Sequence, residues 1–199
     1  MTRASAHFYL YCASLLAVSA FAGCGSVPVE NFYTLTAAAP TSAAPASKGI
    51  DIFIGPITVP EMLDRPQLVM QFAPNRIAVL EQQRWAQPLA SEILRVMALN
   101  LQNNLVNARV TTQRQAGVTD TATRLSLEVL RFDSLLGKEV NIELSWLVQH
   151  GAAGKPIRGR AAAREAVAAP GYDAIMTAHS RALATLSRDL AEAIMRNTP

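Results

Sequence analysis

Large apolar side chains occupy every second position between residues 140 and 148, and this alternation constrains the fold more than any other feature of the sequence. The apolar positions are Val140, Ile142, Leu144, Trp146 and Val148. Successive side chains of a strand point to opposite faces of a sheet, so a period of two predicts one buried face and one open face. Such strands are typical of antiparallel sheets covered on a single side. We therefore expect Trp146 to lie in the core.

Further strands are predicted on both sides of this segment. Residues 125–129 alternate in the same way, and the stretch 135–138 joins the two segments as a hairpin. Residues 157–167 predict a third strand of the same meander. Upstream, strands are predicted at 32–35 (an edge), 50–59, 67–72, 77–80 and 109–112. Pro56 and Pro60 predict that the 50–59 strand lies at an edge or bends late, because proline cannot donate to a sheet ladder.

Two segments change to helical spacing. Apolar residues recur at positions 89, 93, 96, 97, 101 and 105, and again at 175, 178, 182, 186, 190 and 194. Pro88 suits the first turn of the first helix, where an N–H would have no helical partner, and Glu92 falls elsewhere around the wheel. The order of strands, helix, three-strand meander and helix predicts a single α+β domain. Two amphipathic helices would cover one face of a mostly antiparallel sheet.

The N-terminus has the pattern of an exported lipoprotein. Arg3 precedes the uncharged run Phe8 to Ala22, which has the length of a secretory signal and falls short of the about 20 apolar residues of a transmembrane helix. The run ends in Phe21-Ala22-Gly23-Cys24, similar to the lipobox, with Phe21 in place of the usual leucine. An ordinary secretory signal cut at the same small residues is the alternative. We expect residues 1–23 to be removed and Cys24 to carry diacylglycerol and an N-acyl chain such as palmitate.

The mature chain then divides into a tether and one domain. Residues 24–31 form the lipidated tether, residues 32–197 form a periplasmic domain, and residues 36–49 form a Pro/Ala/Ser-rich loop within it. Both cysteines lie at or before the cleavage site, so no disulfide is expected. Gly25 follows the cysteine where inner-membrane lipoproteins usually carry aspartate, which favours the outer membrane.

Composition argues against several classes of function. The net charge of +3 is too small to indicate nucleic-acid binding, and there is no basic block with interleaved aromatic residues. No Gly-x-Ser-x-Gly nucleophile motif is present. His150 and His179 lie apart and lack paired carboxylates, whereas a zinc site needs three or four converging ligands. We expect no enzyme activity, no metal and no cofactor beyond the covalent lipid.

Several segments, taken in order, resemble the ABC-type transport auxiliary lipoproteins, the PqiC/YmbA-like family. The matching segments are Phe32–Leu35, Val59-Pro60 with Leu63–Val69, Asn75–Ile77 and Arg84–Leu89. The last of these commonly reads Trp-Ala-Glu-Pro-Leu in the family, so Gln87 departs from the pattern. The resemblance spans most of the mature chain, with its specific motifs in residues 32–105.

This resemblance implies a fold similar to the N-terminal domain of TolB. It also implies a non-catalytic subunit, anchored to the outer membrane on its periplasmic face, that works with an MCE-domain protein and a membrane permease. Such systems move lipids or other hydrophobic molecules between the two membranes. Direct binding of a lipid cargo and assembly into a homo-oligomer stay open. The alternatives are an envelope structural or regulatory lipoprotein that contacts cell-wall machinery and, third, a periplasmic hydrolase.

Two features of the motif segments are candidates for partner binding. The first is the cluster Asp64, Arg65, Pro66 and Gln67, in which Arg65 offers a bidentate fork to a partner. Alternatively the cluster is a structural turn, in which Asp64 caps local amides and Pro66 directs the chain into the next strand. The second is Trp85, which either anchors an interface or packs the start of the helix onto the sheet.

Overall fold

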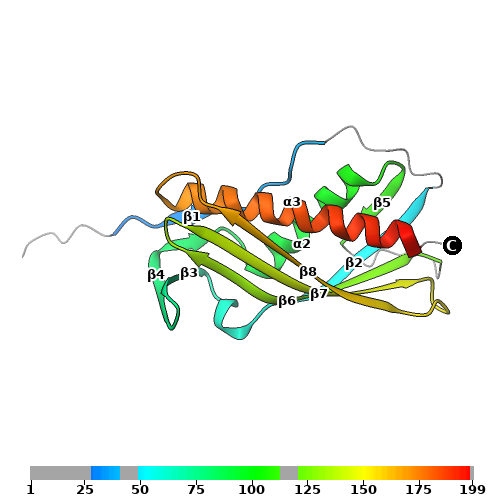
Figure 1. Ribbon diagram of the computed structural model, residues 1–199, viewed down its shortest axis with the longest axis horizontal. Coiled ribbons are helices and arrows are strands. Elements are labelled where there is room, and N and C mark those ends of the chain that lie inside the picture. Colours follow the sequence, from blue (N-terminus) through cyan, green and yellow to red (C-terminus); the bar gives the residue numbers. More distant parts are fainter. Residues whose placement is uncertain (1–27, 41–48, 113–120, 198–199) are drawn as a thin grey trace, which may run out of the picture.

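The computed structural model describes residues 28–40, 49–112 and 121–197, so the predicted signal peptide and Cys24 lie outside the described residues. The strands are β1 (Asn31–Tyr33), β2 (Ile50–Thr58), β3 (Gln67–Ala73), β4 (Arg76–Trp85), β5 (Ala108–Thr111), β6 (Thr123–Leu135), β7 (Glu139–His150) and β8 (Ile157–Ala166). The helices are the 3-10 turn η1 (Glu61–Leu63), α2 (Leu89–Asn104) and α3 (Tyr172–Asn197). The predicted α+β class is confirmed (Figure 1).

Within the described residues, the eight strands form one sheet built around β6. One edge of β6 pairs along its length with β7, and β7 pairs with β8. The other edge pairs first with β2 and then, near Leu135, with β3. The three longest ladders, β6–β7, β7–β8 and β3–β4, are antiparallel, whereas β1–β4, β2–β5 and β2–β6 are shorter and parallel.

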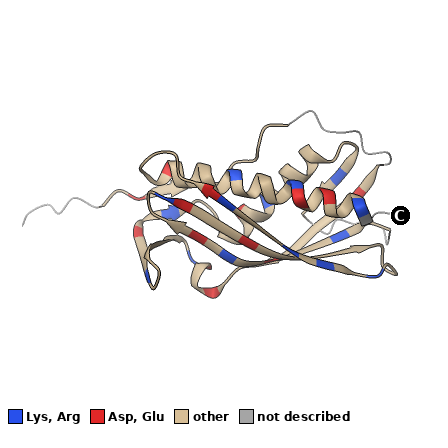
Figure 2. Cartoon of the chain, viewed as in Figure 1, with Lys and Arg blue, Asp and Glu red and all other residues tan. Residues whose placement is uncertain are grey.

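Helices α2 and α3 lie together on one face of this sheet, as the sequence predicted (Figure 1). The alternation in β7 explains the arrangement, because Val140, Ile142, Leu144 and Val148 are buried beneath the helices. Charged residues recur along β6, β7 and β8 (Figure 2), and the burial pattern and registers of these strands place most of them on the uncovered face. No helix in the described part of the chain is long and apolar enough to cross a membrane.

Trp146 departs from its prediction as a core residue. It shares the helix-facing side of β7 with Leu144 and Val148 but is only partly buried. Its indole lies against Gly159 on the neighbouring strand β8, where a Cβ would come within 2.3 Å of the ring. The glycine therefore makes room for an indole that the core does not enclose.

Pro56 and Pro60 predicted that β2 lies at an edge of the sheet or bends late. Strand β2 is not at an edge. It lies between β6 and β5. The other expectation, a late bend, is what the structure has: the register with β6 shifts between Ile54 and Ile57. This irregularity lets an interior strand carry a residue that has no N–H to donate.

Candidate functional site

A surface pocket of about 290 Å³ gathers the two motif segments that the sequence singled out. Residues 64–66 form one side of it and residues 85–88 form the other. The indole of Trp85 is buried, whereas the residues on either side of the opening are exposed. Segments about twenty positions apart in the sequence therefore make one site.

Backbone hydrogen bonds hold the two sides of this pocket in place. Trp85 N donates to Pro66 O at 2.7 Å, which ties one side directly to the other. Ala86 N donates to Tyr33 O at 2.8 Å, so the end of β1 borders the same site. Pro88 precedes α2 as its N-cap, and its carbonyl accepts from Ser91 N and Glu92 N. The pocket thus lies where β1, β4 and α2 meet.

The expected capping role of Asp64 is not found. The backbone N–H groups of Asp64 and Arg65 donate to Glu61 O and Leu63 O, so the main chain of η1 organises this turn. Among the described residues, the side chains of Asp64 and Arg65 are exposed and have no hydrogen-bond or ion-pair partner. A carboxylate and a guanidinium are therefore presented at the rim of an otherwise mainly apolar pocket.

Gln67 and Trp85 have different surroundings from the rim residues. Gln67 does not line the pocket; its Nε2 donates to Glu81 Oε2 at 3.1 Å, and it borders a separate interior cavity of about 10 Å³. Trp85 packs edge-on against Phe132 with ring centroids 6.2 Å apart. Packing is thus one role of Trp85, and the same ring also lines the pocket.

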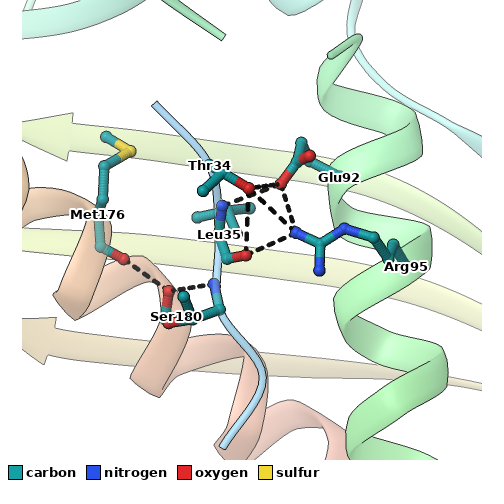
Figure 3. Close-up of polar contacts among 7 residues, drawn as sticks. Thr34, Leu35, Glu92, Arg95, Met176 and Ser180 are labelled. Atoms are coloured by element: carbon teal, nitrogen blue, oxygen red, sulfur yellow. Dashed lines mark hydrogen bonds and ion pairs between the residues drawn. The ribbon is translucent and has the colours of Figure 1, made fainter. Parts of the chain in front are cut away.

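A second polar site was missed by sequence reasoning. Residues 34–38, which we call the strap, pass between α2 and α3 in an extended conformation (Figure 3). Glu92 Oε2 accepts from Thr34 Oγ1 at 2.7 Å and from Leu35 N at 2.9 Å. Arg95 Nη2 donates to the same carboxylate oxygen at 2.8 Å and to Leu35 O at 2.6 Å. One carboxylate therefore organises the strap.

The strap continues along the helices through contacts to its main chain. Ser180 Oγ accepts from Thr36 N at 3.1 Å, and Asn100 Oδ1 accepts from Ala38 N at 2.8 Å. Asn103 Nδ2 donates to Ala38 O at 3.0 Å. The beginning of the predicted 36–49 loop is consequently bound to both helices rather than looping away from the edge strand.

The structure corrects the predicted placement of Glu92 on α2. Its side chain is fully buried, although the sequence placed it elsewhere around the wheel. Burial alone raises the pKa of Glu92, but hydrogen bonds from Leu35 N, Thr34 and Arg95, together with the Arg95 charge, lower it below its usual range. Glu92 follows Leu89 by three residues and precedes Val96 by four, and this spacing is the sequence signal for the buried face.

His179 makes a buried hydrogen bond in the core. Its Nε2 lies 2.6 Å from Ser134 Oγ, and its ring stacks on Phe132 with centroids 4.0 Å apart. Desolvation lowers the pKa of His179 to about 3, so the imidazole is neutral near pH 7. His179 and Ser134 are enclosed, and within the described residues no cluster of three His, Cys, Asp or Glu side chains could hold a metal. The pair is therefore part of the packing of α3 on the sheet.

A family model described as "ABC-type transport auxiliary lipoprotein component" matches residues 33–191. This range includes both the strap and the residues that line the pocket. The chain belongs to the ABC-type transport auxiliary lipoprotein family. Among its relatives is the intermembrane transport lipoprotein PqiC of Escherichia coli K12, 26% identical over 131 residues, which are 65% of this chain and 68% of PqiC. PqiC of Shigella flexneri matches equally.

Solved structures share the fold of this family member. Protein XCC0632 from Xanthomonas campestris has a TM-score of 0.65 and 16% identity, covering 83% of this chain and 95% of its own. A second crystal structure, of an uncharacterized protein, has a TM-score of 0.71 and 20% identity, covering 83% and 99%. These similarities establish the single-domain α+β fold.

Proposed function

We propose that this transport auxiliary lipoprotein is a lipid-anchored, non-catalytic periplasmic subunit of an MCE/ABC-type intermembrane transport system. Lipid on Cys24 would hold it on the periplasmic face of the outer membrane. The pocket between residues 64–66 and 85–88 would bind the MCE-domain protein or permease partner. The system would carry lipid or another hydrophobic molecule between the membranes.

The convergence of the two motif segments on one pocket carries this proposal. Residues 64–66 and 85–88 belong to different elements, yet they line the same 290 Å³ hollow. The side chains of Asp64 and Arg65 are exposed at its rim and make no hydrogen bond or ion pair within the described residues, so both are available to a partner. Tryptophan and arginine are enriched among the residues that contribute most to binding at protein interfaces, and one of each lines this pocket.

The first test is capture of native partners. Arg65→Ala in the full-length lipoprotein should weaken capture of the MCE-domain protein from detergent-solubilised envelopes by at least about tenfold, because it removes a charged hydrogen-bonding fork worth roughly 1.5–3 kcal/mol. The melting temperature should change by less than about 2 °C, since Arg65 has no partner within the described part of the fold. The matched control is Arg158→Ala, which removes another exposed arginine from β8, on the uncovered sheet face.

Normal capture by Arg65→Ala together with a large loss of stability would contradict this role and favour a structural turn. Recovery of cell-wall enzymes alone by the wild-type protein would replace the transport role with that of an envelope regulator. Both results would leave lipid anchoring at Cys24 as a separate question.

A further inference from the structure

Exposed apolar side chains gather where the β3–β4 hairpin meets the β6–β7 turn. Ile77, Phe72 and Leu136 are 44%, 41% and 39% exposed. Gln71 joins them, because it faces Ile77 across the hairpin, pairs with Leu135 on β6 and accepts a hydrogen bond from Leu136 N at 3.4 Å. We call Phe72, Ile77 and Leu136 the apolar tip.

Two basic residues border the apolar tip. Arg76 begins β4 beside Ile77, and Lys138 follows Leu136 in the β6–β7 turn; both are exposed. The next acidic residue, Glu139, is occupied by a bidentate contact from Arg164, with Nε–Oε2 at 2.6 Å. Arg76, Lys138 and Arg164 outnumber this one carboxylate, so the tip presents apolar side chains flanked by a net positive charge. That combination suits the boundary between acyl chains and anionic headgroups of a bilayer.

The tether leaves the domain at the same end of the molecule (Figure 1). Strand β1 runs parallel to β4, with Asn31 opposite Gln83, so the chain before Asn31 starts out toward the beginning of β4, where Arg76 lies. Asn31 lies seven positions after Cys24, and Gln83 lies seven positions after Arg76. Seven residues span at most about 25 Å. The tether is thus long enough to bring a lipid on Cys24 level with the apolar tip.

The tether and the strand that follows it also expose apolar side chains in this region. Val29 of the tether and Phe32 of β1 are 78% and 62% exposed, more than any other large apolar residue of the described chain. Glu30 forms an ion pair with Arg84, which holds the tether against β4. Exposed apolar residues therefore occur both on the tether and on the tip.

We propose that the apolar tip docks on the phospholipid surface that holds the anchor, so that the domain is oriented on the membrane rather than swinging freely from its tether. The proposal rests on lipid anchoring at Cys24. Three partly exposed side chains bind a bilayer weakly by themselves. The anchor changes this, because it confines the tip near the bilayer and makes the second contact intramolecular. Docking would give the partner pocket a defined height and orientation above the membrane.

The test places an environment-sensitive fluorophore at the tip. Acylation on Cys24 leaves the mature protein without a free thiol, so Ile77→Cys provides a single site for an NBD label. The labelled lipoprotein is reconstituted into vesicles of phosphatidylethanolamine and phosphatidylglycerol. Leu99→Cys on α2 is the matched control, since Leu99 is equally exposed, at 46%.

We expect the label at position 77 to shift to the blue and to be quenched by spin labels at the headgroup, with a label at position 99 remaining solvent-like. Arg76→Glu combined with Lys138→Glu should reduce the quenching at position 77 at least twofold. Vesicle-bound protein with solvent-like emission at position 77, or equal quenching at both positions, would overturn docking and leave the anchor intact. Protein that fails to co-sediment with vesicles would overturn anchoring and docking together.

Discussion

At the scale of single residues, the polar side chains of Glu92, Ser134 and His179 are buried, and each has a hydrogen-bond partner that compensates for its burial. Glu92 is enclosed because it binds the strap, and Ser134 is enclosed because it bonds to His179. Each arrangement leaves one atom unsatisfied, namely Glu92 Oε1 and His179 Nδ1. Unpaired buried polar atoms cost free energy, so these residues make stability sensitive to protonation.

The pH dependence of stability should be dominated by His179 between pH 6.5 and 4.5. The pKa of His179 is about 3 in the folded state and 6.5 in the unfolded state. Between these values the unfolded chain binds one more proton, so the free energy of unfolding decreases as the pH is lowered below 6.5. Urea unfolding should show a loss of about 2–3 kcal/mol across this window. His179→Gln should flatten the slope. His150→Gln should change it less, because His150, whose pKa is also lowered by burial, is only partly buried.

A second prediction concerns the indole that lies on β8. Gly159→Ala should destabilise the protein by about 1–3 kcal/mol, because the new Cβ would fall 2.3 Å from Trp146 and push the ring toward water. Thermal unfolding would measure the loss, and a red shift of tryptophan emission would report the displacement. Ala162→Ser, on the opposite face of β8, should leave both unchanged. A neutral Gly159→Ala would contradict the close packing.

At the scale of elements, the strap joins three parts of the fold that are distant in sequence. It leaves β1, crosses α2 through Glu92 and Asn100, and meets α3 through Ser180 (Figure 3). The helices bind the main chain of the strap at Leu35, Thr36 and Ala38. They also bind the Thr34 hydroxyl, and the Leu35 side chain is buried in the core. The strap therefore links the tethered edge strand to the helical layer.

Removing the carboxylate should loosen this link. Glu92→Ala should destabilise the domain by about 2–4 kcal/mol, because Leu35 N and Thr34 Oγ1 lose their buried acceptor. Hydrogen exchange at Leu35 should accelerate more than exchange in β7. Glu128→Ala, an exposed carboxylate of β6, should cost less than about 0.5 kcal/mol. Unchanged exchange at Leu35 in the first variant would show that Glu92 does not hold the strap.

The sequence predicted those elements whose signals are local. The β6–β7–β8 meander and both helices were predicted because their periodicity lies within each segment. Strand β4 extends to Trp85, beyond the predicted 77–80, because its second half pairs with β1, a contact that no local pattern reports. Strand β2 lies inside the sheet because β5 and β6 flank it.

At the scale of the whole molecule, the one-sided sheet separates the surfaces available for function. The helices cover one face, charged residues occupy the other, and the pocket and apolar tip lie near the end from which the tether leaves (Figures 1 and 2). A lipid at Cys24 would place that end closest to the membrane. The anchor should therefore govern location without contributing to folding.

Cys24→Ala tests that separation. The variant should accumulate either as a soluble periplasmic protein or as an uncleaved precursor still held by its signal segment, because no helix of the described residues can span a membrane. A released form should retain the wild-type melting temperature. Fractionation of the variant as a mature, tightly membrane-bound protein would contradict lipidation at Cys24.

The sequence by itself determined the class of fold and the segments that matter, because period-two and helical patterns and the order of motifs are properties of neighbouring residues. Only the tertiary structure decided which motif residues meet. It brought Asp64, Arg65, Pro66 and Trp85 to one pocket and left Gln67 outside it. It also buried Glu92, because a strap nearly sixty residues earlier in the chain supplies the partners that make a buried carboxylate tolerable.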